Sequence, residues 1–180
     1  MLLKLFYLYR KSPKRLRELK VFGEIYDQSV PKPYKSYGTR WIAHKIKAME
    51  NVLNNYGIYI KHLESLAHTD SQALKRAEIQ GEAKKWKNAK FPIHLALYID
   101  VLTPLKVLSL GFQKEKHDPV LAVRRIKEFN WTMAKLQLLI DSALSEDNAD
   151  RLINNTKLFK EINESKYQDI ELVNLDIHRE

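Results

Sequence analysis

The chain contains no cysteine among its 180 residues, and this absence removes several classes of protein at once. Without thiols, the sequence cannot form a disulfide framework, a cysteine-based zinc site, a cysteine protease or an iron–sulfur cluster. Disulfide scaffolds are typical of oxidising compartments. We therefore expect the chain in an intracellular, reducing compartment.

Glycine and proline are scarce as well, with 5 and 6 residues, and no Asn-Gly or Asp-Gly pair occurs. Those pairs are the strongest signals for tight hairpins, so their absence favours helices. The most apolar stretches, residues 91–102 and 136–140, fall short of the roughly 20 residues needed to cross a bilayer. Lys4 splits the apolar start of the chain and no small-residue cleavage site follows, so we interpret residues 2–10 as a helix rather than a signal peptide. We expect no membrane partner.

What the chain does contain, 44% hydrophobic and 29% charged residues, is enough to build one domain. We expect a mainly α fold, an irregular bundle of about six to seven helices. The expected helical segments are residues 2–10, 13–26, 40–54, 58–66, 70–86, 91–112, 119–144 and 150–163, and residues 54–57 either bend or end the helix that starts near Arg40. Residues 29–38 form a connector, because Pro31 and Pro33 remove backbone donors and keep their predecessors extended. Beyond Ser165, strand and coil both remain open.

Caps and apolar spacing predict where these helices begin and which side they bury. Ser12 followed by Pro13, and Asp118 followed by Pro119, are typical helix starts; Thr39 is a third expected cap, and Thr69 or Asp70 a fourth. Pro104 predicts two helical pieces or one kinked helix over 91–112. The residues of the long helix expected to face inward are Val123, Ile126, Phe129, Met133, Leu136 and Ile140. We expect Trp86 at a surface-to-core boundary and Trp131 packed.

Charge is the most informative compositional feature. The formal net charge is +9, and residues 1–50 hold 12 Lys/Arg against 4 Asp/Glu, a balance of +8. Tyr34, Tyr37 and Trp41 interleave with these cations, a pattern typical of surfaces that neutralise phosphates and stack bases. The candidate nucleic-acid-binding residues are Lys11, Lys14, Arg15, Arg17, Lys20, Lys32, Lys35, Arg40, Trp41, His44 and Lys47. The alternative is a solvated surface that only keeps the protein soluble.

Signals for catalysis or for a cofactor are missing. The five glycines are isolated, so no phosphate-binding loop is present, and neither a Gly-x-Ser-x-Gly nor a His-Glu-x-x-His pattern occurs. Asp100 imitates an acidic residue on a buried strand, but Pro92 and Pro104 flank it without a strand-and-turn pattern. We therefore expect no enzyme, no metal site and no cofactor.

Several residue strings resemble the transposases of the hAT superfamily, and more closely their domesticated zinc-finger-type relatives in vertebrates. The strings are SPKRLREL at 12–19, GTRW at 38–41, NYG at 55–57, HLE at 62–64, KHDPV at 116–120 and WTMAKL at 131–136. They span roughly residues 10 to 140. The resemblance implies a nuclear protein.

The resemblance also implies a place for the chain within an RNase H-like transposase. Residues 1–38 would be the end of the core with its basic helix and connector, residues 39–164 the helical insertion, and residues 165–180 a tail. Trp41 would stack on DNA near the cleavage site, with Arg40 as its cationic neighbour. The three metal-binding carboxylates of the family would lie before Met1 and beyond Glu180, and the zinc finger would lie off this chain, which implies a catalytically silent protein.

Two functions follow from these observations. The first is a DNA-binding remnant, in which the basic amino-terminal third holds phosphates. The second is a helical module for protein contacts or self-association without DNA binding, since helices that once packed against a nuclease core would leave apolar surface exposed. An incomplete gene product of marginal stability is the remaining alternative.

Overall fold

The computed structural model describes residues 1–36, 41–114, 118–144 and 166–173. These parts contain seven helices and one short hairpin, which confirms the expected mainly α fold. The elements are α1 (Leu2–Arg10), α2 (Pro13–Ile25), α3 (Trp41–Asn54), α4 (Tyr56–Thr69), α5 (Ala73–Trp86), α6 (Lys90–Lys114), α7 (Pro119–Leu144), β1 (Lys166–Tyr167) and β2 (Ile170–Glu171). The helix expected over 150–163 lies outside the described residues.

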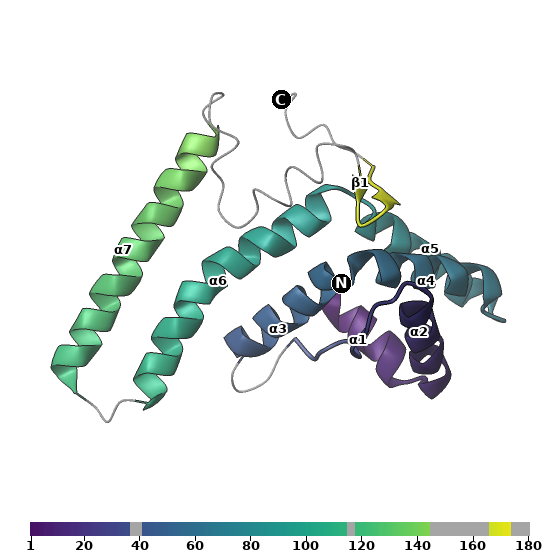
Figure 1. The fold of residues 1–180 in the computed structure, drawn as a ribbon, viewed down its shortest axis with the longest axis horizontal. Helices are drawn as coiled ribbons and strands as arrows, with labels where there is room; N and C mark the ends of the chain where they lie inside the picture. The colour runs from purple at the N-terminus through teal and green to yellow at the C-terminus, as the bar shows by residue number, and fades with distance from the viewer. Residues whose placement is uncertain (37–40, 115–117, 145–165, 174–180) are drawn as a thin grey trace.

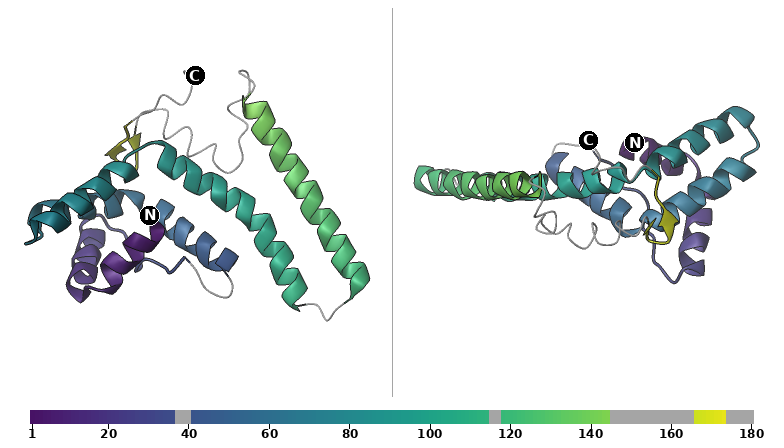
Figure 2. Two further views of the ribbon diagram at one scale, coloured as in Figure 1. Left: turned by 180° about the vertical axis from the view of Figure 1, so that it is seen from behind. Right: turned by 90° about the horizontal axis from the view of Figure 1, so that it is seen from above.

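The helices are arranged in two unequal groups (Figure 1). Helices α1, α2, α4 and α5 pack together at one end, α6 and α7 run side by side as a long pair at the other, and α3 joins the two by packing along α6. Seen from above, the α6–α7 pair is a thin extension of the thicker end (Figure 2). The core draws on residues 5–30, 46–102 and 167–172, so all three expected segments of the chain contribute to it.

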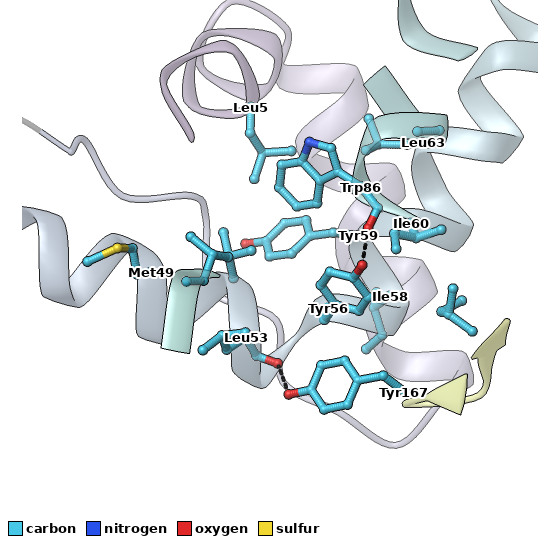
Figure 3. Close-up of a cluster of buried hydrophobic side chains, with 14 of the residues drawn as sticks. Leu5, Met49, Leu53, Tyr56, Ile58, Tyr59, Ile60, Leu63, Trp86 and Tyr167 are labelled. Atoms are coloured by element: carbon cyan, nitrogen blue, oxygen red, sulfur yellow. Dashed lines mark hydrogen bonds between the residues drawn. The ribbon is translucent and has the colours of Figure 1, made fainter. Parts of the chain in front are cut away.

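Aromatic side chains from α4 and α5 fill the centre of this core (Figure 3). Tyr56, Tyr59 and Trp86 are almost completely buried, and the Tyr56 hydroxyl donates a hydrogen bond to the Trp86 carbonyl. The Trp86 ring lies 4.8 Å from that of Phe91, centroid to centroid. The expectation that Trp86 lies at a surface-to-core boundary is wrong, because its side chain is almost completely buried and lies next to Leu5 in the core (Figure 3).

Within the described part of the tail, residues 166–173, the choice between strand and coil is resolved in favour of a short hairpin. Tyr167 pairs with Ile170, and the Tyr167 hydroxyl donates to the Leu53 carbonyl at 3.2 Å. Between the strands, the Gln168 side-chain oxygen accepts the Gly57 N–H at 3.0 Å. Gly57 permits this approach because a Cβ there would lie 2.6 Å from the Gln168 carbonyl oxygen. The hairpin is therefore bound to the start of α4.

Two of the expected caps are confirmed. Ser12 has an extended backbone and its Oγ accepts the Arg15 N–H at 3.4 Å, with Pro13 as the first residue of α2. Asp118 Oδ1 accepts the Val120 N–H at 2.9 Å at the start of α7. These caps follow from local chemistry, since a side-chain oxygen satisfies an amide that the first helical turn leaves without a partner.

The other two expected caps have different outcomes. Helix α5 begins at Ala73 with Gln72 as its cap, so the expectation that Thr69 or Asp70 caps it is wrong. Asp70 instead accepts the Gln72 N–H within the turn, at 3.1 Å, and Thr69 donates back to the Ser65 carbonyl. Thr39 lies outside the described residues.

Helix α6 continues through Pro104 as one curved helix rather than two pieces (Figure 1). Because proline has no N–H, it removes one helical hydrogen bond and favours such a bend. The expectation that no segment is long and apolar enough to cross a membrane is wrong by length and composition: Lys90–Gln113 has 24 residues and a mean hydropathy of 1.6 in its most apolar window. The prolines and charged residues within this segment do not lower its mean hydropathy below that of a membrane-spanning helix. The absence of a membrane partner stays a prediction.

Helix α7 is covered on one side only, as far as the described residues extend. Phe129, Met133 and Leu136 face α6 as expected, but Val123 and Ile126 are exposed, and Trp131, which we expected to be packed, is 63% exposed. The side chain of Ile140 lies outside the described residues. These expectations fail because α6 is the one described helix that packs substantially along α7, and a single partner covers a single stripe.

Candidate nucleic-acid interface

The candidate interface begins with the outer surface of α2. Leu19 and Gly23 bury one side of this helix, which leaves Lys14, Arg17 and Lys20 exposed on the other. Lys14 lies 3.8 Å from Glu18, one turn further along, a distance typical of a weak surface pair. The three cations are thus displayed on a helix whose opposite side is fixed in the core.

Arg15 differs from its neighbours. Its guanidinium is largely buried and lies 2.5 Å from the Asp70 carboxylate, and a hydrogen bond from the Gln72 N–H together with this arginine lowers the pKa of Asp70. Arg15 therefore ties α2 to the α4–α5 turn and does not belong to the exposed row of cations. Sequence spacing along α2 cannot reveal this, because Asp70 is distant in the sequence.

Lys11 also lies apart from the α2 cations. Lys11 is the C-cap residue of α1, and its Nζ lies 5.7 Å from the centre of the Tyr7 ring. It borders a groove of about 730 Å³ between α1 and α5, where Lys4 pairs with Glu82 at 2.9 Å. Acidic side chains of α5 therefore line the same groove as Lys11.

The connector and α3 supply a second basic group. Val30 and Pro33 are buried and the Tyr59 hydroxyl donates to the Pro31 carbonyl at 3.0 Å, so the connector is held against α4. Lys32 is exposed between these anchors, and Lys35 is exposed two residues after the last of them.

The exposed cations of α3 lie near an aromatic ring of this connector. Lys47 Nζ lies 4.3 Å from the centre of the Tyr34 ring, and His44, one turn before Lys47, is exposed. The structure thereby brings Tyr34 and Lys47 together, as the interleaving of aromatic and basic residues in the sequence suggested.

Trp41 opens α3 and is 46% exposed, so its ring is not a core anchor. Lys45 Nζ lies 5.3 Å from the ring centre, and the indole borders a small hollow of about 80 Å³ against Leu110 of α6. An exposed indole beside a lysine is suited to stacking on a base. Arg40 lies outside the described residues, and the stacking role of Trp41 stays a prediction.

The cation–aromatic pairs that were not predicted from the sequence include Lys45 with Trp41 and Lys61 with Tyr26. Lys45 lies four residues after Trp41, a helical spacing that could have revealed it. Lys61 Nζ lies 4.0 Å from the centre of the half-exposed Tyr26 ring, and nothing in the sequence links these two distant residues. Both pairs place a lysine over an aromatic ring close to the basic segments.

Metal ligands do not gather in the parts of the chain that the structure describes. No three His, Asp or Glu side chains there could hold an ion together. Asp100 lies on α6, where burial raises its pKa to about 6. The described residues of the candidate interface are suited to binding a polyanion and provide no cluster of acidic groups for phosphoryl transfer.

Comparisons with protein-family models, with curated protein sequences and with solved structures found no match. The likeness to hAT transposases therefore rests on the residue strings alone and stays a prediction.

Proposed function

We propose that the chain is a catalytically inactive nucleic-acid-binding protein that holds the DNA backbone through α2 and the connector. The observation that carries the proposal is the outward row of Lys14, Arg17 and Lys20 on a helix anchored by its buried side. Cations displayed along one side of a fixed helix can contact several phosphates and set the position of the protein on the duplex. The balance of +8 in residues 1–50 supports it.

The connector–α3 group extends the same proposal. Lys32, Lys35, His44 and Lys47 would add phosphate contacts, while Trp41 would stack on an unpaired base. Close to half of the Trp41 side chain is available for such a contact. A nuclear location and a descent from hAT transposases are part of the proposal and depend on the resemblance.

The test is a fluorescence-anisotropy titration of a labelled DNA duplex at several salt concentrations. We expect the logarithm of the binding constant to fall linearly with the logarithm of salt concentration, because each neutralised phosphate releases counterions. Changing Lys14, Arg17 and Lys20 together to Gln should make the slope shallower by up to about 3, roughly 0.9 for each contact.

A matched control removes the same charge elsewhere. Lys84 and Lys85 of α5 and Lys90 of α6 are exposed, and changing them to Gln should leave the slope unchanged. Equal effects of the two triple variants, or binding that is indifferent to salt, would refute the proposed interface. Trp41→Ala should weaken binding to a duplex with a single-stranded end and spare a blunt duplex.

The outer side of α7 favours a second candidate function, self-association of the chain. Val120, Val123, Trp131 and Leu138 are all more than half exposed and form a stripe opposite the side that meets α6. A helix that is apolar on two opposite sides is typical of one covered on both. We propose a second copy of α7 as the partner.

The order of residues along this stripe suits an antiparallel pair. Val120 and Leu138 lie equally far from position 129, and so do Lys127 and Trp131. A two-fold axis at that position would set Val120 against Leu138 of the second copy and Lys127 beside Trp131, whose ring already has Lys135 Nζ of its own helix 3.6 Å from its centre.

Sedimentation and cross-linking test this pairing. Trp131→Ser should shift a dimer toward monomer, whereas Leu74→Ser, at an 89% exposed position on α5, should not. In this cysteine-free chain, mixing Val120→Cys with Leu138→Cys under oxidation should give dimers that neither variant gives alone. A monomer at all concentrations would refute self-association and leave the DNA proposal unaffected.

A further inference from the structure

A polar hollow of about 480 Å³ lies between the amino-terminal half of α2, the end of α4 and the turn into α5. Its wall includes Lys14, Arg15 and Lys75, with Ser65 and Thr69 from α4. This volume is within the range of small-molecule sites and exceeds what a single ion fills. The hollow differs from the outer surface of α2, since Arg17 and Lys20 do not line it.

The most informative residue of the wall is His62, which is 1% exposed. The Tyr9 hydroxyl and His62 Nδ1 are 2.7 Å apart. Burial raises the pKa of Tyr9 well above its ordinary value and lowers the pKa of His62 to about 4, so Tyr9 keeps its proton and the imidazole is neutral at physiological pH. Tyr9 then donates to Nδ1, and the imidazole proton resides on Nε2.

His62 Nε2 is buried and has no hydrogen-bond partner among the described residues. The nearest acidic atom there, Glu18 Oε2, is 3.8 Å away, beyond hydrogen-bond distance. Glu18 lines the hollow together with His62, so the imidazole that carries this nitrogen forms part of its wall. A buried N–H without an acceptor is rare in folded proteins and indicates a group that a ligand would supply.

The charges around the hollow favour an anion. Lys14, Arg15 and Lys75 stand against the two carboxylates of Glu18 and Asp70, which leaves an excess of one positive charge. Arg15 is bonded to Asp70 and Lys14 lies 3.8 Å from Glu18, so Lys75 is the cation that supplies this excess. The first turns of α2 and α5 also reach the hollow, and neither carries an acidic residue. Helix amino termini attract anions through their unsatisfied N–H groups.

We propose that this hollow is a binding site for a phosphate monoester, with His62 Nε2–H, Lys14 and Lys75 donating to the phosphate oxygens. Ser65 and Thr69 supply hydroxyl groups for the organic part of the ligand. The source is either a free nucleotide-like metabolite or a terminal phosphate of a nucleic-acid strand. The site shares Lys14 with the proposed DNA surface, but its other two donors, His62 and Lys75, take no part in that surface.

The experiment is an NMR titration of the full chain with AMP, with adenosine as the matched ligand that lacks the phosphate. We expect AMP to shift the His62 Nε2–H signal and to slow its exchange with water, and adenosine to do neither. Lys75→Gln should weaken AMP binding by about tenfold, the effect of losing one charge-assisted hydrogen bond. Lys84→Gln removes the same charge from the same helix outside the hollow and should have no effect.

Three results would overturn the site: no binding of AMP, equal binding of adenosine, or equal weakening by the Lys75 and Lys84 variants. His62→Phe removes the donor at similar size; if that variant fails to fold, the His62 signal of the natural chain still decides. Competition by an oligonucleotide with a terminal phosphate, but not by the same strand without it, assigns the site to nucleic-acid ends. Failure to compete assigns it to free phosphomonoesters.

The two proposals are separable by the same variants. The Lys75→Gln variant should bind the duplex as the natural chain does. The Arg17→Gln/Lys20→Gln variant should bind AMP as the natural chain does. Loss of both activities in either variant would show that the two sites are not separate. A natural chain that binds only one of the two ligands shows which proposal has failed.

Discussion

Mild acid should destabilise this protein through one buried histidine. His62 is enclosed by Tyr9, Phe22 and the start of α2, and burial is the main reason that its pKa falls from 6.5 to about 4, with the charge of Arg15 acting in the same direction. In the unfolded chain the imidazole is in water and takes up a proton near pH 6.5. Protons therefore bind more readily to the unfolded state between these two pKa values.

The sign and size follow from linkage. Because the folded-state pKa is the lower of the two, the contribution is complete above pH 6.5 and is lost as the pH falls toward 4. The difference between the pKa values gives a loss of about 2 kcal/mol at pH 5 and about 3 kcal/mol by pH 4. Against a typical total of roughly 5–15 kcal/mol, this is a large change.

Urea unfolding followed by circular dichroism at pH 7 and pH 5, in buffers without phosphate, measures this loss. Burial raises the pKa of Asp100 to about 6 and acts in the opposite direction, so the useful quantity is the difference between the natural chain and a His62→Gln variant. The variant should lose about 2 kcal/mol less than the natural chain between the two pH values.

His68→Gln is the matched control, since His68 is an exposed residue of the same helix, and it should retain the pH dependence of the natural chain. An identical pH dependence in the natural chain and in His62→Gln would refute the reasoning that places a neutral, buried imidazole at this position.

Two further predictions concern packing. Gly57→Ala should destabilise the protein and expose the carboxyl-terminal hairpin to proteases, because the added Cβ would lie 2.6 Å from the Gln168 carbonyl oxygen. Gly81→Ala is the control: its new Cβ meets no described atom within 4 Å, and the substitution should stabilise the protein by roughly 0.5–1 kcal/mol. A similar shift of the melting temperature in both variants would contradict a close approach of the hairpin to Gly57. Tyr56→Phe should cost about 1–3 kcal/mol in urea unfolding, since it leaves the buried Trp86 carbonyl without its donor, and an unchanged midpoint would count against that bond.

Much of the secondary structure could be predicted because its causes are local. Ser12 with Pro13 and Asp118 with Pro119 begin helices through contacts within one turn, and the two prolines of the connector exclude regular structure by their own geometry. The scarcity of glycine and proline indicated the mainly α fold, because these residues also act on the backbone locally. These features need no information about distant parts of the chain.

The candidate site could be predicted in outline. Basic residues crowd the first third of the sequence, and the structure leaves Lys14, Arg17 and Lys20 exposed together because helical spacing sets them on one side of α2. The sequence could not separate Arg15 from them. That residue turns inward to Asp70, an ion pair decided by how α2 packs against α4.

The amino-acid sequence by itself determined the helices, their starts and the concentration of positive charge, because caps, prolines and composition act over a few residues. Tertiary structure alone decided what each helix buries. It set Trp86 at the centre of the core, left Trp131 exposed on α7 and enclosed His62 beside a polar hollow. Burial depends on which distant element covers a side, and that is a property of the packed chain rather than of any local pattern.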